Sequence, residues 1–259
     1  MDDTFPCFVK IPEDINASYE AAITENPANR GTSSSGRQKR AVASHTKFWS
    51  PGRTLRIAFL DGEQDFKDAV KAAAQAWLPH INLKFDFVEG TEGDIRITTK
   101  RGNWSYIGTN ALLEKENPTM SLEPYLWWPR FTANVIHEFG HLLGAEHEHL
   151  HPTGNIPWDK EAVYAHHHAA DEEDESYYYK RGIVDERYFN LLDASEVNYS
   201  PYDPLSIMHY EIRPEWTVGD FKVDFNLTLS EADKAFMAKA YPYPDPDPET
   251  ETETETETE

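Results

Sequence analysis

The sequence is organised around the stretch His137-Glu138-Phe139-Gly140-His141-Leu142-Leu143-Gly144-Ala145-Glu146-His147. Residues four apart lie on one face of an α-helix, so His137 and His141 can present their imidazoles to a single metal ion. Glu138 stands next to the first histidine, where a carboxylate can act as general base on a metal-bound water. Gly144 can adopt the left-handed conformation that ends a helix, and the resulting turn would return His147 to the same ion.

Three neutral histidines leave the fourth position of a tetrahedral zinc ion open to water, which is the arrangement of a catalytic site. The alternative is a buried amphipathic helix whose histidines only make hydrogen bonds. The fixed spacing of three histidines, a glutamate and a glycine favours zinc. One catalytic Zn²⁺ is therefore the predicted cofactor.

Length and composition indicate a globular protein. The 259 residues, of which 39% are hydrophobic, suffice for one large domain or two small ones with a core. No apolar run of about 18 residues and no basic segment followed by an apolar one is visible, so we expect the cytoplasm or non-classical secretion rather than classical secretion. The single cysteine, Cys7, excludes an internal disulfide, and stability must come from packing and the metal.

The formal net charge of −22 is concentrated in local acidic runs, at residues 171–175 and 245–259. Nucleic-acid phosphates require clustered Lys and Arg, so this composition argues against a nucleic-acid partner. The tail from residue 243 alternates Pro with Asp and then Glu with Thr, and it cannot bury apolar surface. We therefore expect residues 243–259 to be disordered.

Residues 1–46 form an N-terminal segment that is predicted to be propeptide-like or regulatory. A short helix is expected around Ala17–Ile23, followed by a flexible linker over residues 26–36. The linker leads into Arg37-Gln38-Lys39-Arg40, which resembles a processing-protease site. An ordinary solvated charge cluster is the alternative interpretation of this basic tetrapeptide.

Hydrophobic periodicity predicts a mixed, twisted sheet with a helix packed on one face, and the expected fold class is α+β. The expected strands cover residues 55–59, 81–87 and 94–99, and residues 119–122 are expected to add a short edge strand. The expected helices cover residues 65–78, 130–143 and 160 to about 170, with a last helix after Ser230. Residues 102–117 are predicted to be a loop. His149, His151 and residues 166–168 are expected on the polar surface and not as ligands.

A second stretch, Ser206-Ile207-Met208-His209-Tyr210, follows the zinc motif by about sixty residues. The two motifs together closely resemble the astacin family of metzincin metalloproteases, and the resemblance covers roughly residues 47–242. It implies a zincin catalytic domain over residues 47–242, with a twisted mixed sheet, an active-site helix and a more irregular C-terminal lobe closed by a helix. Unlike typical family members, the chain has no paired cysteines, no visible signal peptide and no Arg soon after His147.

The resemblance also implies roles for single residues. His137, His141 and His147 would bind the zinc, Met208 would form an apolar floor beneath them, and Tyr210 would stabilise the oxyanion. Glu148 would receive the new N-terminus after a propeptide is removed. In a latent form either the Cys7 thiolate or an acidic residue such as Asp14 could bind the zinc. The alternative is that each is an ordinary solvated or packed residue, which the lack of a flanking motif favours.

The predicted function is a zinc-dependent metalloendopeptidase that hydrolyses internal peptide bonds by metal-activated water, with Glu138 as general base. Its expected partner is a peptide or protein substrate, without nucleic acid or membrane. A non-catalytic binding protein on the same scaffold and a zinc hydrolase acting on something other than peptide remain the alternatives.

Overall fold

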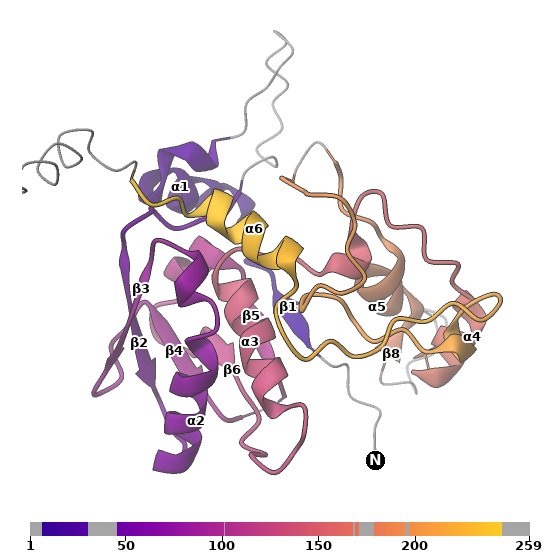
Figure 1. Ribbon diagram of the computed structural model, residues 1–259, viewed down its shortest axis with the longest axis horizontal. Coiled ribbons are helices and arrows are strands. Elements are labelled where there is room, and N and C mark those ends of the chain that lie inside the picture. The colour runs from indigo at the N-terminus through magenta and orange to yellow at the C-terminus, as the bar shows by residue number, and fades with distance from the viewer. Residues whose placement is uncertain are drawn as a thin grey trace, which may run out of the picture.

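The part of the chain that the computed structural model describes consists of two lobes, each with its own hydrophobic core (Figure 1). The described residues are 7–30, 46–100, 102–167, 169–170, 179–194 and 197–244. The basic tetrapeptide at residues 37–40, His168, the acidic run at 171–175 and most of the C-terminal tail lie outside these residues.

The larger lobe is built on a six-stranded sheet with the order β1-β5-β6-β4-β2-β3. Its strands β2, β4, β3 and β6 are parallel, β5 is antiparallel to β6, and β1 pairs in parallel with β5. The alternating side chains of β2 explain its position, because Leu55 and Ile57 are fully buried. The strands cover β1 (Phe8–Lys10), β2 (Thr54–Phe59), β3 (Lys84–Val88), β4 (Ile95–Thr98), β5 (Trp104–Tyr106) and β6 (Met120–Ser121).

Two helices cover one face of this sheet and pack against each other, α2 (Gln64–Ala74) and α3 (Phe131–Leu142) (Figure 1). Helix α2 ends at Ala74, before the predicted Leu78, and Trp77 lies beyond it in the core. The Trp77 indole donates a 2.9 Å hydrogen bond to the Ile136 carbonyl of α3. The predicted helices and strands of this lobe are confirmed, with shifts of a few residues at their ends.

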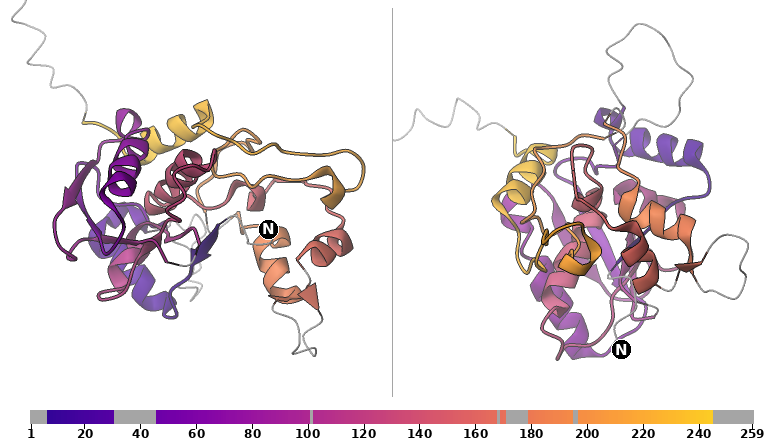
Figure 2. Two further views of the ribbon diagram at one scale, coloured as in Figure 1. Left: turned by 90° about the horizontal axis from the view of Figure 1, so that it is seen from below. Right: turned by 90° about the vertical axis from the view of Figure 1, so that its right-hand side faces the viewer.

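Two predictions about the sheet are wrong. The sequence predicts a loop at Trp104–Tyr106, but these residues form β5, because a three-residue strand is too short to show a period. The sequence also predicts an edge strand at Met120–Ser121, but β6 lies between β5 and β4. The outer strand on this side is β1, from the N-terminal segment, which lies between the two lobes (Figures 1 and 2).

The N-terminal segment also contributes α1 (Ile15–Glu25) and a 3₁₀ turn at Pro27–Asn29. Part of the predicted linker is therefore ordered. Helix α1 contacts the 3₁₀ helix η3 (Gly108–Leu113) of the larger lobe. The prediction of a helix around Ala17–Ile23 is confirmed.

The smaller lobe packs mainly aromatic side chains around Tyr188, which is fully buried. Asp159 caps its first helix, α4, as predicted, by accepting a hydrogen bond from the Ala162 amide. Its elements are η4 (Glu148–Leu150), α4 (Lys160–His166), β7 (Ala169–Ala170), β8 (Tyr179–Lys180), α5 (Arg181–Val184), the π-helix η5 (Asp185–Phe189) and η6 (Pro214–Trp216). Helix α4 thus ends before the predicted residue 170.

The chain returns to the larger lobe in α6 (Glu231–Ala240), which contacts the 3₁₀ turn η2 (Leu78–His80). Ser230 and Asp233 form a reciprocal capping box at its start, which confirms the predicted cap. None of the described helices is long and apolar enough to cross a membrane.

Candidate metal centre and active site

Helix α3 places His137 and His141 one turn apart in the floor of the site, with ring centroids 4.8 Å apart. Their Nδ1 atoms lie 2.7 Å from the Ile207 carbonyl oxygen and 2.8 Å from that of Ala145, respectively. Because a carbonyl only accepts, each Nδ1 carries the proton and donates. Each Nε2 therefore keeps a free lone pair, which is the form that binds a metal.

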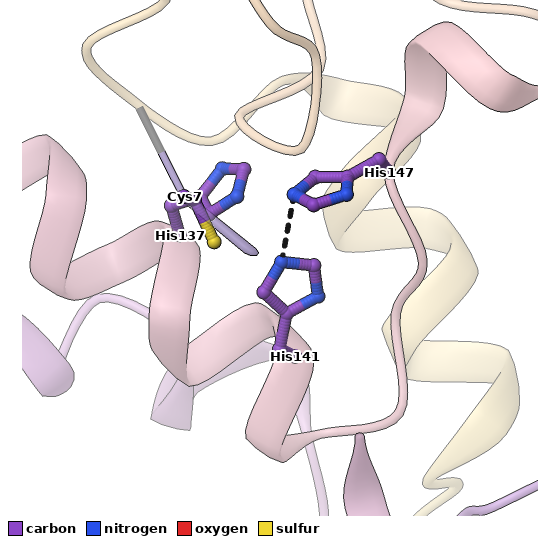
Figure 3. A group of neighbouring side chains, drawn as sticks. All are labelled: Cys7, His137, His141 and His147. Carbon is purple, nitrogen blue, oxygen red and sulfur yellow. Dashed lines mark hydrogen bonds between the residues drawn. The ribbon is translucent and has the colours of Figure 1, made fainter. Parts of the chain in front are cut away.

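Gly144 ends the helix in the predicted left-handed conformation, with a φ of +99°. A Cβ at this position would also approach the Phe48 ring to 2.8 Å, so glycine is required by both conformation and space. The turn brings His147 back, with its ring centroid 4.5 Å from that of His141 and 5.2 Å from that of His137. The Nε2 atoms of His141 and His147 are 3.1 Å apart (Figure 3).

Cys7 completes a group of four side chains around one point (Figure 3). The four potential ligand atoms, one from Cys7 and one from each histidine, all lie within 4.8 Å of one another. Asp14, the other residue that the sequence suggests, instead caps α1 by accepting hydrogen bonds from the Asn16 and Ala17 amides. The structure thus places Cys7, and not Asp14, beside the three histidines, although the sequence around Cys7 carries no recognisable motif.

Glu138 lies beside this group and is fully buried. Neither of its carboxylate oxygens has a hydrogen-bond partner of normal geometry, and the neighbouring Cys7 thiol is the polar group that interacts with it. Burial raises the pKa of Glu138 to about 8, and the interaction with Cys7 only partly offsets this. A cavity of about 20 Å³, large enough for one water molecule, is lined by Glu138, His137 and Tyr210 among others.

The residues present fit a metal ion. Burial lowers the pKa of His137 to about 4 and those of His141 and His147 well below the ordinary value, so all three imidazoles are neutral at pH 7. The Nε2 atom of His137 is buried without a hydrogen-bond partner, as are both oxygens of Glu138. Buried polar atoms are rarely left unpaired in a native protein, and three imidazoles with a thiol are a donor set typical of zinc.

The second sequence motif, Ser206–Tyr210, packs against the helix that carries His137 and His141. A Cβ on Gly140 would lie 2.3 Å from the Met208 sulfur, so Met208 packs directly against α3 at the residue before His141. Ile207 supplies the carbonyl that orients His137. The backbone of this turn is held in place by Asp233, which accepts hydrogen bonds from the Ser206 hydroxyl (2.6 Å) and the Ile207 amide (2.8 Å).

Tyr210 is buried next to the site, with its ring centroid 4.5 Å from that of His147. Its hydroxyl donates a 2.5 Å hydrogen bond to the Cys7 carbonyl. Its ring stacks on that of His149 with a 4.0 Å separation of the centroids. In this form the N-terminal segment therefore holds the hydroxyl of Tyr210.

The prediction that the remaining histidines lie on the polar surface is wrong for three of them. His149, His151 and His167 are all buried. The His149 Nε2 lies 2.7 Å from the Arg187 carbonyl and the His151 Nε2 lies 2.7 Å from the Ser200 carbonyl, so each ring bonds a backbone segment that is distant in the chain. Sequence spacing gives no sign of this burial, because the partners are distant in the chain.

Glu148 lies at a larger cavity of about 100 Å³, whose wall includes Thr46 and Lys47. It accepts a 2.7 Å hydrogen bond from the Asp203 amide, and burial raises its pKa to about 7. Its role in receiving a new N-terminus stays a prediction.

This geometry agrees with what the chain resembles among known proteins. The family model described as Astacin, a peptidase family, matches residues 41–217. The chain belongs to the astacin family. As an astacin-family protein it is a zinc metalloendopeptidase that uses one catalytic zinc and acts on peptide or protein substrates. The mixed sheet with its helices is the metzincin fold that the sequence predicts.

Several solved structures resemble this astacin-family chain. It is 37% identical to myroilysin in one structure, with a TM-score of 0.68, covering 76% of this chain and 97% of that one. A second myroilysin structure is 36% identical, with a TM-score of 0.57, covering 76% of this chain and 86% of that one. High choriolytic enzyme 1, a hatching enzyme zinc-protease from Oryzias latipes (medaka fish), is 17% identical with a TM-score of 0.48, covering 74% of this chain and 92% of that one. Among curated proteins, none matches the chain.

Proposed function

We propose that the chain is an endopeptidase in which His137, His141 and His147 hold the zinc and Glu138 is the general base. The observation that carries this proposal is the buried Glu138 carboxylate, which has no hydrogen-bond partner of normal geometry and lies beside three imidazoles that could share one ion. Such a carboxylate is positioned to bind a reacting water molecule and not to stabilise the fold.

The zinc ion, when bound, supplies a Lewis acid that polarises the peptide carbonyl and makes water more acidic. Glu138 accepts the proton of the attacking water at one carboxylate oxygen and delivers it to the nitrogen of the leaving amine. The carbonyl partners of His137 and His141 keep these rings in the tautomer that binds metal. Met208 packs on Gly140 and so supports the helix that carries His137 and His141.

In the same proposal, the conformation in which Cys7 lies beside the three histidines is a latent state of the enzyme. Cys7 provides the fourth ligand atom of the group, and its carbonyl accepts the hydrogen bond from Tyr210. A Cys7 thiolate at this position would exclude the attacking water molecule. The Tyr210 hydroxyl, while bonded to the Cys7 carbonyl, could not reach the oxyanion of the reaction. Tyr210 becomes an oxyanion donor once Cys7 has left.

The role of Glu138 is tested by Glu138→Ala in enzyme freed of residues 7–30, with hydrolysis measured on denatured casein and zinc content measured by elemental analysis. A variant that keeps its full zinc content but does not hydrolyse casein supports the assignment of Glu138 as the base. Treating the unmodified enzyme with a chelator measures the hydrolysis that does not depend on zinc. Normal hydrolysis by the variant would remove Glu138 as the base. The proposed zinc ligands are tested by comparing the zinc content of two variants. His141→Ala should lose stoichiometric zinc, and the control His151→Ala should retain it.

The latent state is tested without activity, by replacing zinc with cobalt in the full-length chain. A thiolate ligand gives a sulfur-to-cobalt charge-transfer band in the near ultraviolet. Cys7→Ser should abolish this band while the visible bands of imidazole-bound cobalt remain. A full-length protein that lacks the band contradicts ligation by Cys7.

A further inference from the structure

The outer edge of β5 holds an extended segment whose contacts outline a surface for a peptide. Strand β1 lies beside β5 and pairs with it in parallel (Figure 1). In this register Phe8 lies opposite Trp104, and Lys10 lies opposite Tyr106. The residue before the strand is Cys7, which lies beside the three histidines. An extended peptide that pairs along the same edge therefore also reaches the metal centre.

The Lys10 ammonium contacts the faces of two aromatic rings of β5. It lies 4.0 Å from the Trp104 ring centroid and 5.7 Å from that of Tyr106. Both distances are within the range of a cation–π interaction, in which the negative face of a ring attracts a positive charge. Trp104 and Tyr106 are two residues apart on one strand, so their side chains lie on the same face of the sheet. The two rings can therefore contact one cation together.

The electrostatic surroundings of these rings also favour a cation. Burial raises the pKa of the Tyr106 hydroxyl, and the negative charges of Glu114 and Glu13 raise it further. Glu114 follows η3 and is not part of the N-terminal segment, so its charge acts on this edge whichever peptide lies there. The formal net charge of −22 also attracts cationic peptides over a longer range when the salt concentration is low.

The position nearer the metal centre has a different chemistry. The Phe8 ring stacks on that of Trp104, with 6.0 Å between the ring centroids. The Arg187 guanidinium of the smaller lobe lies 5.6 Å from the Phe8 ring centroid. An aromatic side chain at this position attracts the guanidinium, whereas a second cation there would be repelled by it. The edge thus distinguishes between two positions that are two residues apart.

From these contacts we propose that Trp104 and Tyr106 form a substrate subsite for the cationic side chain of lysine or arginine. An aromatic side chain of the substrate occupies the position of Phe8, two residues nearer the metal centre. Lys10, which fills the subsite here, is three residues from Cys7, so the subsite lies about 10 Å from the metal centre along an extended chain. This inference rests on the proposed function, because it names the class of peptide that the same site cleaves.

The preference of the two rings for a cation is tested in the full-length chain. Cys7 is the single cysteine and is 3% exposed, so its reaction with a chromogenic thiol reagent reports how readily β1 leaves the edge. Lys10→Met should speed this reaction by about 5- to 30-fold, as expected for a lost cation–π contact, whereas Lys10→Arg should change it by less than about twofold. Equal rates for Lys10→Met and the unmodified chain would overturn the proposal.

A double-mutant cycle tests whether the rings cause this preference. In a Trp104→Leu background the effect of Lys10→Met should fall below about twofold. Tyr106→Leu, at a less buried position, should also reduce the effect and serves where Trp104→Leu does not fold. Trp127→Leu is the matched control and should leave the effect unchanged, because this side chain is 80% exposed in the loop between β6 and α3. An undiminished effect in both ring variants would exclude the rings as the cation site.

Substrate selection is tested with peptides that differ in one side chain. Enzyme freed of residues 7–30 is given quenched fluorescent peptides that contain Phe-Ala-Lys or Lys-Ala-Phe, with either lysine or acetyl-lysine. Acetyl-lysine has a similar length and no charge, so kcat/KM should be about 5- to 30-fold higher for lysine, and Trp104→Leu should bring the ratio close to one. A ratio close to one in the unmodified enzyme would overturn the proposal.

The products of the two peptide orders test the arrangement of the two positions. Mass spectrometry should place the cleaved bond on the phenylalanine side of the triplet in both orders, because Arg187 repels lysine from the position nearer the metal centre. Cleavage mainly on the lysine side would contradict this arrangement.

The thiol measurements do not depend on catalysis. If they show the cation preference but the enzyme hydrolyses no peptide, the proposed function fails and the cation site stands. If peptides are hydrolysed without a preference for lysine, the proposed function stands and this inference fails.

Discussion

Tyr210 shows how one side chain can serve both the latent and the active form. Its hydroxyl bonds the Cys7 carbonyl, while its ring is held between His147 and His149. The ring therefore keeps two partners outside the N-terminal segment, and the partner of the hydroxyl is the contact that has to change on activation.

Replacing Tyr210 with Phe should retain this packing and remove the hydroxyl. In enzyme freed of residues 7–30 we expect kcat to fall by about 100-fold with KM and zinc content little changed, the size of effect found for a lost oxyanion donor. Steady-state kinetics on a peptide substrate measure this. An unaltered kcat would remove Tyr210 from the mechanism.

Asp61 offers a prediction about pH at the same scale. Burial alone would raise its pKa, but hydrogen bonds from Thr98 and Thr99 outweigh burial and hold the pKa below its ordinary value of 3.8. The ionised carboxylate is therefore favoured by folding, and its stabilising contribution is complete above the unfolded pKa and lost as pH falls through the folded one.

Asp61→Asn should consequently lower the free energy of unfolding at pH 7, and its difference from the unmodified protein should shrink as pH falls below the ordinary value of about 3.8. Urea unfolding of both proteins at each pH measures the difference between their free energies of unfolding. Zinc release at low pH affects both proteins alike and therefore cancels in this difference. A difference that grows on acidification would contradict the sign of this shift.

At the scale of elements, the start of α6 is connected to the metal centre. The Asp233 carboxylate accepts a hydrogen bond from the amide of Ser230, the N-cap of α6, and also from Ser206 and Ile207. The Ile207 carbonyl in turn orients His137. The start of α6 thus helps to position the ring of His137, a proposed zinc ligand that lies far earlier in the chain.

Asp233→Ala should therefore lower stability by about 2 kcal/mol, as expected for a lost cap with buried hydrogen bonds. It should also weaken zinc binding by about 10-fold, because the Met208 turn loses its support. Chelator competition measures the second effect, which a simple loss of the helix cap would not produce. Glu231→Ala is the control, since Glu231 is exposed and pairs with Lys234 on the surface.

Gly144 gives a second prediction at this scale. Gly144→Ala should lower the free energy of unfolding by about 1–3 kcal/mol, because a φ of +99° is strained for alanine and the Phe48 ring blocks the added methyl. Denaturant unfolding measures this. The same substitution at Gly90, where φ is +87° and no described atom lies within 4 Å of the added methyl, shows the cost of the conformation alone.

At the scale of the whole molecule, the N-terminal segment joins the two lobes. Cys7 belongs to the core of the smaller lobe, whereas Phe8–Lys10 extends the sheet of the larger lobe. Zinc bound by Cys7 and the three histidines would add a further connection between the lobes.

Removing zinc from the full-length protein should therefore lower its Tm by several degrees, because an ion that binds only the folded state stabilises it. Cys7→Ser should reduce this difference, since one ligand and its link to the smaller lobe are lost. Differential scanning calorimetry with and without a chelator measures both. Equal Tm values for the zinc-bound and zinc-free protein would contradict a zinc site in this chain.

The sequence by itself determined the elements whose signals are local. The four-residue spacing of His137 and His141, the glycine at 144 and the capping residues of α6 act within one or two turns, so their consequences follow from helix geometry. The tertiary structure alone decided that Cys7, and not Asp14, lies beside the three histidines. It also decided that Phe8–Lys10 forms the outer strand of the sheet and that His149 is buried against Tyr210. These contacts join residues far apart in the chain, and no local pattern encodes which distant partners meet when the two lobes pack around the N-terminal segment.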